Sequence, residues 1–217
     1  MLSGYSEPLS WNKLAVAPIW LKDKFLYWIK REKEHALNGE PARIIAKMNS
    51  LCDQDIIAAL YEASEAGVEI DLIVRGICSL KTGIPGISER IRVRSIVGRF
   101  LEHSRIFYFE NKGKEEIYCG SADWMPRNLE RRVEIVFPIE EENLRKKIIH
   151  ILEGELRDTL KASIMTSTGI YEKVDRRGKE SYSSQGSLVI EAREAARAQK
   201  EVAKNRVFIP AIHLEEE

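Results

Sequence analysis

Apolar side chains recur at helical spacing in two segments of the first third of the chain. Residues 23–37 show this spacing, and Asn38-Gly39 marks the end of the predicted helix. A second helix is predicted over residues 54–65, with Asp53 as its N-terminal cap and Gly67 as its C-terminal stop. The sequence between the two helices is predicted to contain a strand.

Short apolar runs predict the strands of a sheet. Residues 42–48 are a β-branched apolar run, which is typical of a buried strand, and residues 68–74 form a similar run. Because the second helix lies between these runs, the order predicts a βαβ unit with parallel strands and a right-handed crossover. A hairpin turn is predicted at Asn111-Lys112-Gly113. Four more short strands are predicted, at residues 91–96, 105–109, 116–119 and 133–137.

The two ends of the chain differ from this central pattern. An amphipathic helix is predicted over residues 140–162, with the apolar stripe of a helix that covers a sheet. Residues 163–187 are polar and are predicted to form a loop, followed by a helix over residues 188–206. The predicted organisation is a lead-in from an upstream domain at residues 1–21, an α/β domain at residues 22–162, and a polar loop with a C-terminal helix and tail at residues 163–217.

The length of 217 residues allows one well-packed domain with a tail, or two very small domains. Hydrophobic residues make up 44% and charged residues 31%, as in ordinary soluble globular proteins. No segment approaches the roughly 18 consecutive apolar residues of a membrane span, and no secretory signal pattern is present. The cysteines (Cys52, Cys78 and Cys119) are odd in number and far apart, which favours free thiols in a reducing cytosol over a disulfide framework or a zinc site.

Charge is unevenly distributed along the chain, although the net charge is zero. Acidic residues concentrate late in the sequence, whereas basic residues gather in its middle. The basic residues are Arg75, Lys81, Arg90, Arg92, Arg94, Arg99, Arg105, Arg127, Arg131 and Arg132. A basic middle in a neutral chain indicates one local anion site and makes no case for a nucleic-acid surface. Taken alone, the same pattern also fits solvent-exposed arginines on strands and loops.

One segment has a spacing that suits phosphate chemistry. His103-Ser104-Arg105 is followed, after four further residues, by Glu110, and Gly120-Ser121-Ala122-Asp123 comes later. Side chains at positions i and i+2 of a strand share one face, so His103 and Arg105 are predicted to face the same pocket. An imidazole can act as a nucleophile or acid–base group near neutral pH. A guanidinium can bind two phosphate oxygens at once.

Neighbouring polar residues could complete this site. Gly120-Ser121 would let a phosphate approach the backbone and a hydroxyl, and Glu110 or Glu134 is a candidate to hold one imidazole nitrogen. Each residue also has an ordinary structural alternative: His103 as a structural histidine, Glu110 as an exposed residue beside a turn, and Asp123 as a turn or helix cap. The other histidines have no partner pattern and are expected to be structural or surface residues; they are His35, His150 and His213.

The two motifs resemble a degenerate form of the phospholipase D signature, H-x-K-x4-D followed by G-S-x-N. The similarity to the polyphosphate kinase family is more extensive, since it spans most of residues 12–160 and includes the positions that depart from phospholipase D. Its longest runs are Ile45–Asp53 (IAKMNSLCD), Ile70–Leu80 (IDLIVRGICSL), Ile91–Phe107 (IRVRSIVGRFLEHSRIF) and Ser121–Glu134 (SADWMPRNLERRVE). The resemblance implies a phospholipase-D-like mixed β-sheet flanked by helices.

The resemblance to polyphosphate kinases also implies a function. Members of that family transfer the terminal phosphate of ATP reversibly to polyphosphate with Mg²⁺, and this chain is similar to the second of their two phospholipase-D-like domains. The phosphorylated histidine lies in the first of those domains, so the chain alone is expected to be inactive, with Mg²⁺ ligands outside it. Arg75 then corresponds to an arginine that contacts nucleotide phosphates, and His103 to an acid–base group. Arg132 and Glu134 correspond to a polar pair in the same tunnel.

Roles and partners follow from the same resemblance. It implies catalytic roles for His103, Arg105 and Glu134, binding of substrate or ATP by Arg75, His103 and Arg132, and support from Glu110, Ser121 and Asp123. The implied partners are ATP or ADP, polyphosphate and the preceding phospholipase-D-like domain, and not nucleic acid. The full-length enzyme is expected to be a cytoplasmic homo-oligomer, with peripheral membrane association left open.

The number of histidine motifs leaves alternatives open. A phospholipase-D-like site needs two motifs, whereas this chain has one and no internal repeat, so a second domain or chain must supply the other half. One alternative is a dimeric phosphodiesterase with His103 from each chain, although the H-x-R and G-S-x-D forms count against it. Another is a non-catalytic polyanion-binding module, in which His103→Ala would leave phosphate binding unchanged.

Overall fold

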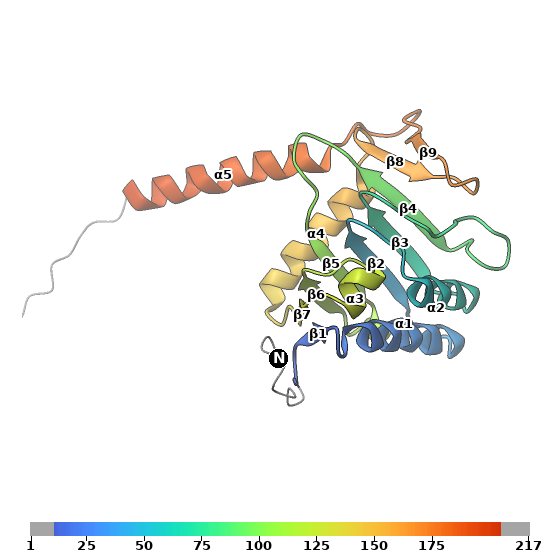
Figure 1. Cartoon of the computed structure of the whole chain (residues 1–217). Coiled ribbons are helices and arrows are strands. Elements are labelled where there is room, and N and C mark those ends of the chain that lie inside the picture. The colour runs from blue at the N-terminus through green and yellow to red at the C-terminus, as the bar shows by residue number, and fades with distance from the viewer. Residues whose placement is uncertain (1–10, 205–217) are drawn as a thin grey trace, which may run out of the picture.

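The computed structural model describes residues 11–204, which form one nine-stranded mixed sheet with helices on both faces (Figure 1). The strand order across the sheet is β1-β7-β6-β5-β2-β3-β4-β8-β9. The strands are β1 (Ala15–Ala17), β2 (Arg43–Met48), β3 (Glu69–Val74), β4 (Ile91–Ile96), β5 (Arg105–Phe109), β6 (Glu116–Gly120), β7 (Glu134–Pro138), β8 (Ala162–Met165) and β9 (Tyr171–Lys173). The helices are α1 (Leu21–Leu37), α2 (Gln54–Glu65), α3 (Pro126–Glu130), α4 (Glu142–Arg157) and α5 (Ser184–Lys204). The predicted α/β fold with a mixed sheet flanked by helices is confirmed.

Three parallel strands form the centre of the sheet. β2 pairs in parallel with β3, with Ile44 opposite Ile70, and β3 pairs in parallel with β4. α2 links β2 to β3, as the predicted βαβ unit requires. β5 runs antiparallel to β2, with Lys47 opposite Ile106. The carboxyl ends of β2, β3 and β4 therefore lie at the same edge of the sheet as the amino end of β5.

Apolar layers on both faces fix this edge in place. On the face covered by α1 and α2 (Figure 1), the rings of Phe25 and Phe107 lie 4.6 Å apart and those of Phe107 and Trp124 lie 5.4 Å apart. Such aromatic pairs each contribute about 0.5–1.5 kcal/mol beyond area burial. On the other face, α4 buries Leu152 in a cluster with Ile45. Trp124 thereby anchors the chain immediately after Asp123.

The predicted hairpin turn is confirmed at residues 111–113. Asn111, Lys112 and Gly113 all have positive φ values of 45°, 59° and 79°, a left-handed conformation that suits asparagine and glycine. The fully buried carboxylate of Glu32 in α1 accepts the backbone N–H groups of Asn111 at 3.0 Å and Arg43 at 3.3 Å. Burial raises the pKa of Glu32 above its usual range, although these N–H groups oppose the shift. A buried carboxyl group therefore ties the turn to α1.

The long helix α4 is shorter than predicted. It ends at Arg157 rather than at Ala162, because Asp158 leaves the helical conformation with φ −58° and ψ 122°. The Asp158 carboxylate then accepts the backbone N–H groups of Lys161 at 2.7 Å and Ala162 at 3.1 Å. This turn directs the chain back into the sheet as β8.

The predicted loop over residues 163–187 was wrong. β8 pairs antiparallel with β4, and β9 with β8, so two short strands of this segment extend the sheet. α5 begins at Ser184 rather than at residue 188, and the hydroxyl of Ser183 accepts the N–H of Gly186 at 3.2 Å. From there α5 projects away from the sheet (Figure 1).

The sheet also extends into the predicted lead-in. β1 lies within residues 1–21 and pairs with β7, with Ala15 opposite Val136. With β8 and β9, the sheet therefore continues past both limits of the predicted domain at residues 22–162. Residues 1–10 and 205–217, with His213 and the end of the predicted last helix, lie outside the described residues. Within residues 11–204, no helix combines the length and apolar character needed to cross a bilayer.

Candidate functional site

Most of the predicted site residues lie at the edge of the sheet where β2 and β3 end. Asn49 follows β2, Arg75 follows β3, and Arg105 is the first residue of β5. Because β6 is antiparallel to β5, Gly120 at the end of β6 pairs with Arg105 at the start of β5. The segment that carries Asp123 therefore starts at this same edge. Sheet topology thus assembles residues from four distant parts of the chain.

A continuous chain of hydrogen bonds links these residues. Arg75 donates through Nε to Oδ1 of Asn49 at 2.9 Å. Asn49 donates to Oδ1 of Asp123 through its backbone N–H at 2.9 Å and through Nδ2 at 3.2 Å. Arg105 donates through Nε to the same oxygen of Asp123 at 3.0 Å. The buried Asp123 therefore orients Arg105 directly and Arg75 through Asn49.

His103 lies at the end of this chain. Nη1 of Arg105 lies 3.0 Å from Nδ1 and 3.2 Å from Nε2 of His103, and it donates to the His103 carbonyl oxygen at 2.8 Å. A guanidinium only donates, so the ring nitrogen that accepts depends on the tautomer. The predicted proximity of His103 and Arg105 is present, with the imidazole exposed to solvent.

The guanidinium of Arg75 uses only part of its hydrogen-bonding capacity within the protein. Within residues 11–204, the Nη atoms of Arg75 make no hydrogen bond or ion pair, so they are free to donate. Arg75 lines an open depression of about 520 Å³ together with Arg99 and the segment from Ile96 to Glu102. A guanidinium with two free donors beside an open depression can bind phosphate oxygens.

Only part of the basic middle of the sequence reaches this edge. Arg92 pairs with Asp71 at 2.6 Å and Arg90 pairs with Glu69 at 2.7 Å, both on the strand portions away from the site. Although burial opposes it, the guanidinium of Arg92 holds the pKa of Asp71 below its usual range. These arginines neutralise carboxylates of the sheet, so they are not available to a phosphate.

Glu134 belongs to a second polar group at the same edge. Its carboxylate accepts from Nδ2 of Asn128 at 2.7 Å and from the hydroxyl of Ser121, and Glu134 is buried. A Cβ atom at Gly120 would lie 2.4 Å from the carbonyl oxygen of Ile135, so only glycine fits where β6 passes β7. Ser121 and Asn128, rather than His103, therefore hold the Glu134 carboxylate.

Two predicted site residues stand apart from these groups. Arg132 is exposed in the segment before β7, and within residues 11–204 its side chain has no ion pair. Glu110 follows β5 and so lies at the opposite end of that strand from Arg105, where it accepts from the hydroxyl of Tyr108 at 2.6 Å. Burial and the Glu110 carboxylate raise the pKa of Tyr108. The structure does not bring Glu110 to His103, because the length of β5 separates them.

Sequence reasoning missed several residues that build the site. Asn49 connects Arg75 to Asp123, and Asn128 holds Glu134. A polar residue directly after a buried strand was the only signal for Asn49. Lys47 gave a clearer one, since a lysine inside an apolar strand is seldom buried without a partner.

Lys47 is the centre of a buried charged network beneath the site. Its ammonium group contacts the carboxylates of Glu102, in the segment before His103, and Glu155 in α4. Arg94 of β4 donates to the Glu155 carbonyl oxygen at 3.0 Å. Oε2 of Glu155 is buried without a hydrogen-bond partner. One ammonium group thus serves two carboxylates, and the more deeply buried one is incompletely satisfied.

The two carboxylates of this network respond in opposite directions. Burial raises the pKa of Glu155 to about 7, and the nearby Glu102 adds to the shift while Lys47 opposes it. Burial acts on Glu102 too, but Lys47 and Gln185 outweigh it and lower the pKa of Glu102. Of the two carboxylates, Glu155 is therefore the one that takes up a proton first as the pH falls.

Glu155→Gln is expected to remove a pH dependence of stability. In the unfolded chain the carboxyl ionises near its ordinary value of 4.5, whereas in the folded protein it ionises near 7. Its stabilising contribution is therefore complete below pH 4.5 and is lost as the pH rises through 7. Between pH 5 and 8 the unfolding free energy of the variant should rise relative to wild type by about 1–3 kcal/mol. Urea unfolding at both pH values measures this, with the exposed Glu153→Gln as control; equal slopes for wild type and Glu155→Gln would contradict it.

Metal ligands are not gathered at this edge. Among residues 11–204, no three or more histidine, cysteine, aspartate or glutamate side chains are grouped so that they could hold a metal ion. The free groups at the edge are cationic, and Asp123 and Glu134 are already occupied by protein donors. The expectation that Mg²⁺ ligands lie outside the chain stays a prediction.

The H-x-R and G-S-x-D motifs lie at one edge of a mixed sheet flanked by helices and define an α/β domain with a histidine and two arginines at that edge. Residues 14–185 match the family described as "Polyphosphate kinase C-terminal domain 2". The chain therefore belongs to the polyphosphate kinase family, as its sequence resemblance implied.

Individual relatives agree with this assignment. The chain is 54% identical over 173 residues to the polyphosphate kinase of Thermosynechococcus vestitus, covering 80% of this chain and 24% of the relative. It is 54% identical over 180 residues to that of Halalkalibacterium halodurans, covering 82% and 25%. The crystal structure of the Porphyromonas gingivalis polyphosphate kinase superposes with a TM-score of 0.85 at 40% identity, covering 91% of this chain and 30% of that one. The chain thus spans about a quarter of the length of these curated relatives.

Proposed function

We propose that this chain forms one half of the active site of a polyphosphate kinase. Phosphate would pass reversibly from ATP to polyphosphate through a phosphohistidine outside this chain. The hydrogen-bonded chain Arg75–Asn49–Asp123–Arg105–His103 is the observation that supports this proposal most strongly. It places two cations and one imidazole at one edge of the sheet, while the relatives are about three times as long as this chain. The second histidine motif would come from that additional length.

The two arginines would neutralise phosphate charge. Phosphoryl transfer demands positioning and charge stabilisation more than covalent chemistry from the protein. Arg75 would bind phosphate oxygens through its free Nη donors, and Arg105 would do so beside His103. Asp123 fixes the direction of Arg105 through Nε, so little ordering of the guanidinium is required when phosphate binds. Mg²⁺ bound with ATP would neutralise further charge on its β- and γ-phosphates.

His103 would act as the acid–base group. When the bond between the β–γ bridging oxygen and the γ-phosphorus breaks and phosphorus bonds to the histidine outside this chain, His103 would donate a proton to the departing oxygen. In the reverse direction it would take that proton back. Its exposed imidazole beside Arg105 is accessible to a substrate at the edge of the sheet. The isolated chain is expected to bind phosphates without turnover, and the expected homo-oligomer and cytoplasmic location stay predictions.

Arg75→Ala is expected to weaken phosphate binding by about 10-fold or more, because a charge-assisted hydrogen bond contributes about 1.5–3 kcal/mol. Calorimetric titration of tripolyphosphate and then Mg-ATP into the chain measures this. The loss should be larger at low salt, because screening weakens exposed charge interactions.

Arg90→Ala is the matched control for this titration. It removes the same charge at the start of β4, away from the site edge, where Arg90 pairs with Glu69. The phosphate affinity of this variant should stay within about two-fold of wild type, since Glu69 already offsets the charge of Arg90 and salt screens exposed charges at a distance. A folded wild-type chain that binds neither ligand would show that the chain holds no independent phosphate site. Equal losses of phosphate affinity in Arg75→Ala and Arg90→Ala would indicate nonspecific electrostatic attraction of anions.

A further inference from the structure

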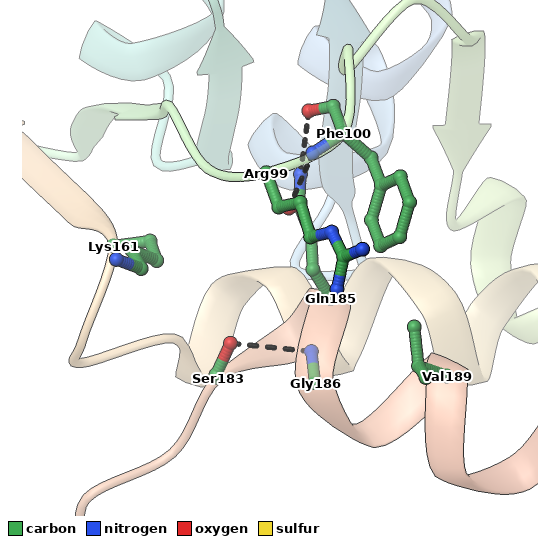
Figure 2. A pocket seen from close by; sticks show the side chains of 7 residues that line it. All are labelled: Arg99, Phe100, Lys161, Ser183, Gln185, Gly186 and Val189. Carbon is green, nitrogen blue, oxygen red and sulfur yellow. Dashed lines mark hydrogen bonds between the residues drawn. The ribbon is translucent and has the colours of Figure 1, made fainter.

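The side chain of Gln185 pairs with the backbone of the segment that leads to His103. Gln185 is the second residue of α5 and is buried. Its Oε1 accepts the N–H of Phe100 at 3.0 Å, and its Nε2 donates to the carbonyl oxygen of Phe100 at 2.8 Å. Figure 2 shows both bonds, with the carboxamide pointing from α5 onto the segment. This two-bond pairing fixes the backbone at Phe100 as a neighbouring strand would.

Glu102 extends the same contact toward the core. Nε2 of Gln185 also donates to Oε1 of Glu102 at 2.6 Å, and the other carboxylate oxygen of Glu102 contacts Lys47. Lys47 lies in β2, two residues before Asn49. The residue directly before His103 is therefore held both by α5 and by the strand that carries the phosphate-binding chain.

The segment that contains Gly98 packs closely against the side chain of Gln185. A Cβ atom at Gly98 would lie 2.4 Å from Oε1 of Gln185, so the segment passes directly over the carboxamide. The apolar side chains of the segment do not hold it, since Val97, Phe100 and Leu101 each expose half or more of their surface. Polar contacts to Gln185 and Glu102, rather than core burial, therefore determine where the segment lies.

We infer that Gln185 and Glu102 are positioning residues, which hold residues 97–102 and thereby place His103 for proton transfer in the proposed reaction. This inference rests on the proposed function. Arg75 is oriented separately, by Asn49, and the hydrogen bonds of Gln185 go to Phe100 and Glu102 and not to Arg75. Loss of the Gln185 contact should therefore disturb the proton-transfer step more than nucleotide binding.

The test uses the T. vestitus polyphosphate kinase with its matching C-terminal region replaced by this chain, including α5. Gln185→Ala is expected to lower kcat about 10-fold or more, because small misplacements of a reacting group can cost up to about 100-fold. The KM for Mg-ATP should stay within about two-fold. In the chain itself, amide hydrogen exchange should accelerate in residues 97–104 and stay unchanged in β2 and β3. Gln199→Ala, at an exposed position of the same helix, is the control and should change neither quantity.

An exchange of functional groups separates positioning from general stability. Gln185→Glu alone sets a second carboxylate against Glu102 and should lower kcat. Combined with Glu102→Gln it restores a donor–acceptor pair between the two positions, and kcat should recover at least three-fold over Gln185→Glu. A folded Gln185→Ala enzyme with unchanged kcat, or a double variant without recovery, would overturn the inference. If Arg75→Ala leaves phosphate binding intact, the proposed function fails instead, whatever the Gln185 variants show.

Discussion

Replacing His103 by alanine is expected to abolish most phosphotransfer in the T. vestitus enzyme that carries this chain as its C-terminal region. The expected loss is about 100- to 10,000-fold in kcat, the usual contribution of a general acid–base group. The reason is local: His103 presents an exposed imidazole at the edge of the sheet, and Nη1 of Arg105 lies beside the His103 ring and donates to the His103 carbonyl oxygen. ATP-dependent synthesis of polyphosphate, measured with and without the substitution, gives the ratio.

Two further measurements decide what a His103→Ala result means. His150→Ala removes an exposed imidazole that pairs with Glu191 on α5, away from the site, and should keep full activity. Tripolyphosphate binding by the isolated His103→Ala chain should stay within about three-fold of wild type, because Arg75 and Arg105 supply most of the charge. Activity that survives His103→Ala unchanged would support the non-catalytic polyanion-binding alternative. Diester cleavage without Mg²⁺ by the isolated chain would support the phosphodiesterase alternative.

The helices and strands predicted correctly from the sequence are those whose bounds are set by residues nearby in the chain. α2 has the predicted bounds because Asp53 caps it, with its carboxylate accepting the N–H of Ile56 at 3.1 Å, and because its apolar stripe is complete. β4 and β5 also have the predicted bounds, since turn and loop residues precede and follow both strands. β8 and β9 were missed because they are short, partly polar strands. β8 is ordered by pairing with the edge of β4, and β9 by pairing with β8, rather than by their own sequence.

Some contacts of the candidate site could likewise be predicted from the sequence, and others could not. The spacing of His103 and Arg105 predicted their proximity, because residues two positions apart in an extended segment can face the same side whatever the sheet order. His103 itself lies in the segment just before β5, which begins at Arg105. Asn49 and Gln185 could not be found in this manner, since their contacts span 74 and 85 residues and depend on which strands become neighbours. Glu110 was misplaced as a partner of His103 because the motif gives a spacing along the chain, whereas the intervening strand is extended and separates its ends.

Lys47→Met is expected to have the largest effect on stability in this chain. The ammonium group of Lys47 is buried between the carboxylates of Glu102 and Glu155, and methionine keeps the length of the side chain but removes its charge. Removing one partner of a buried ion pair leaves an uncompensated charge and costs about 3–5 kcal/mol. Urea unfolding at pH 8 measures the change. Since Glu102 precedes His103, phosphotransfer should fall as well.

The pH dependence of the Lys47→Met effect tests its physical cause. If uncompensated carboxylates are responsible, the loss should be smaller at pH 5, where Glu155, with a pKa of about 7 in the wild type, is protonated and no longer needs the cation. Lys146→Met removes an exposed lysine that pairs with Glu142 on α4, and should cost less than about 1 kcal/mol at either pH. An equal loss at pH 5 and pH 8 would show that Lys47 stabilises the sheet by packing rather than by charge. Packing rather than charge would then connect α4 to the segment before His103. In that case Glu155→Gln should show the same pH dependence of stability as the wild type.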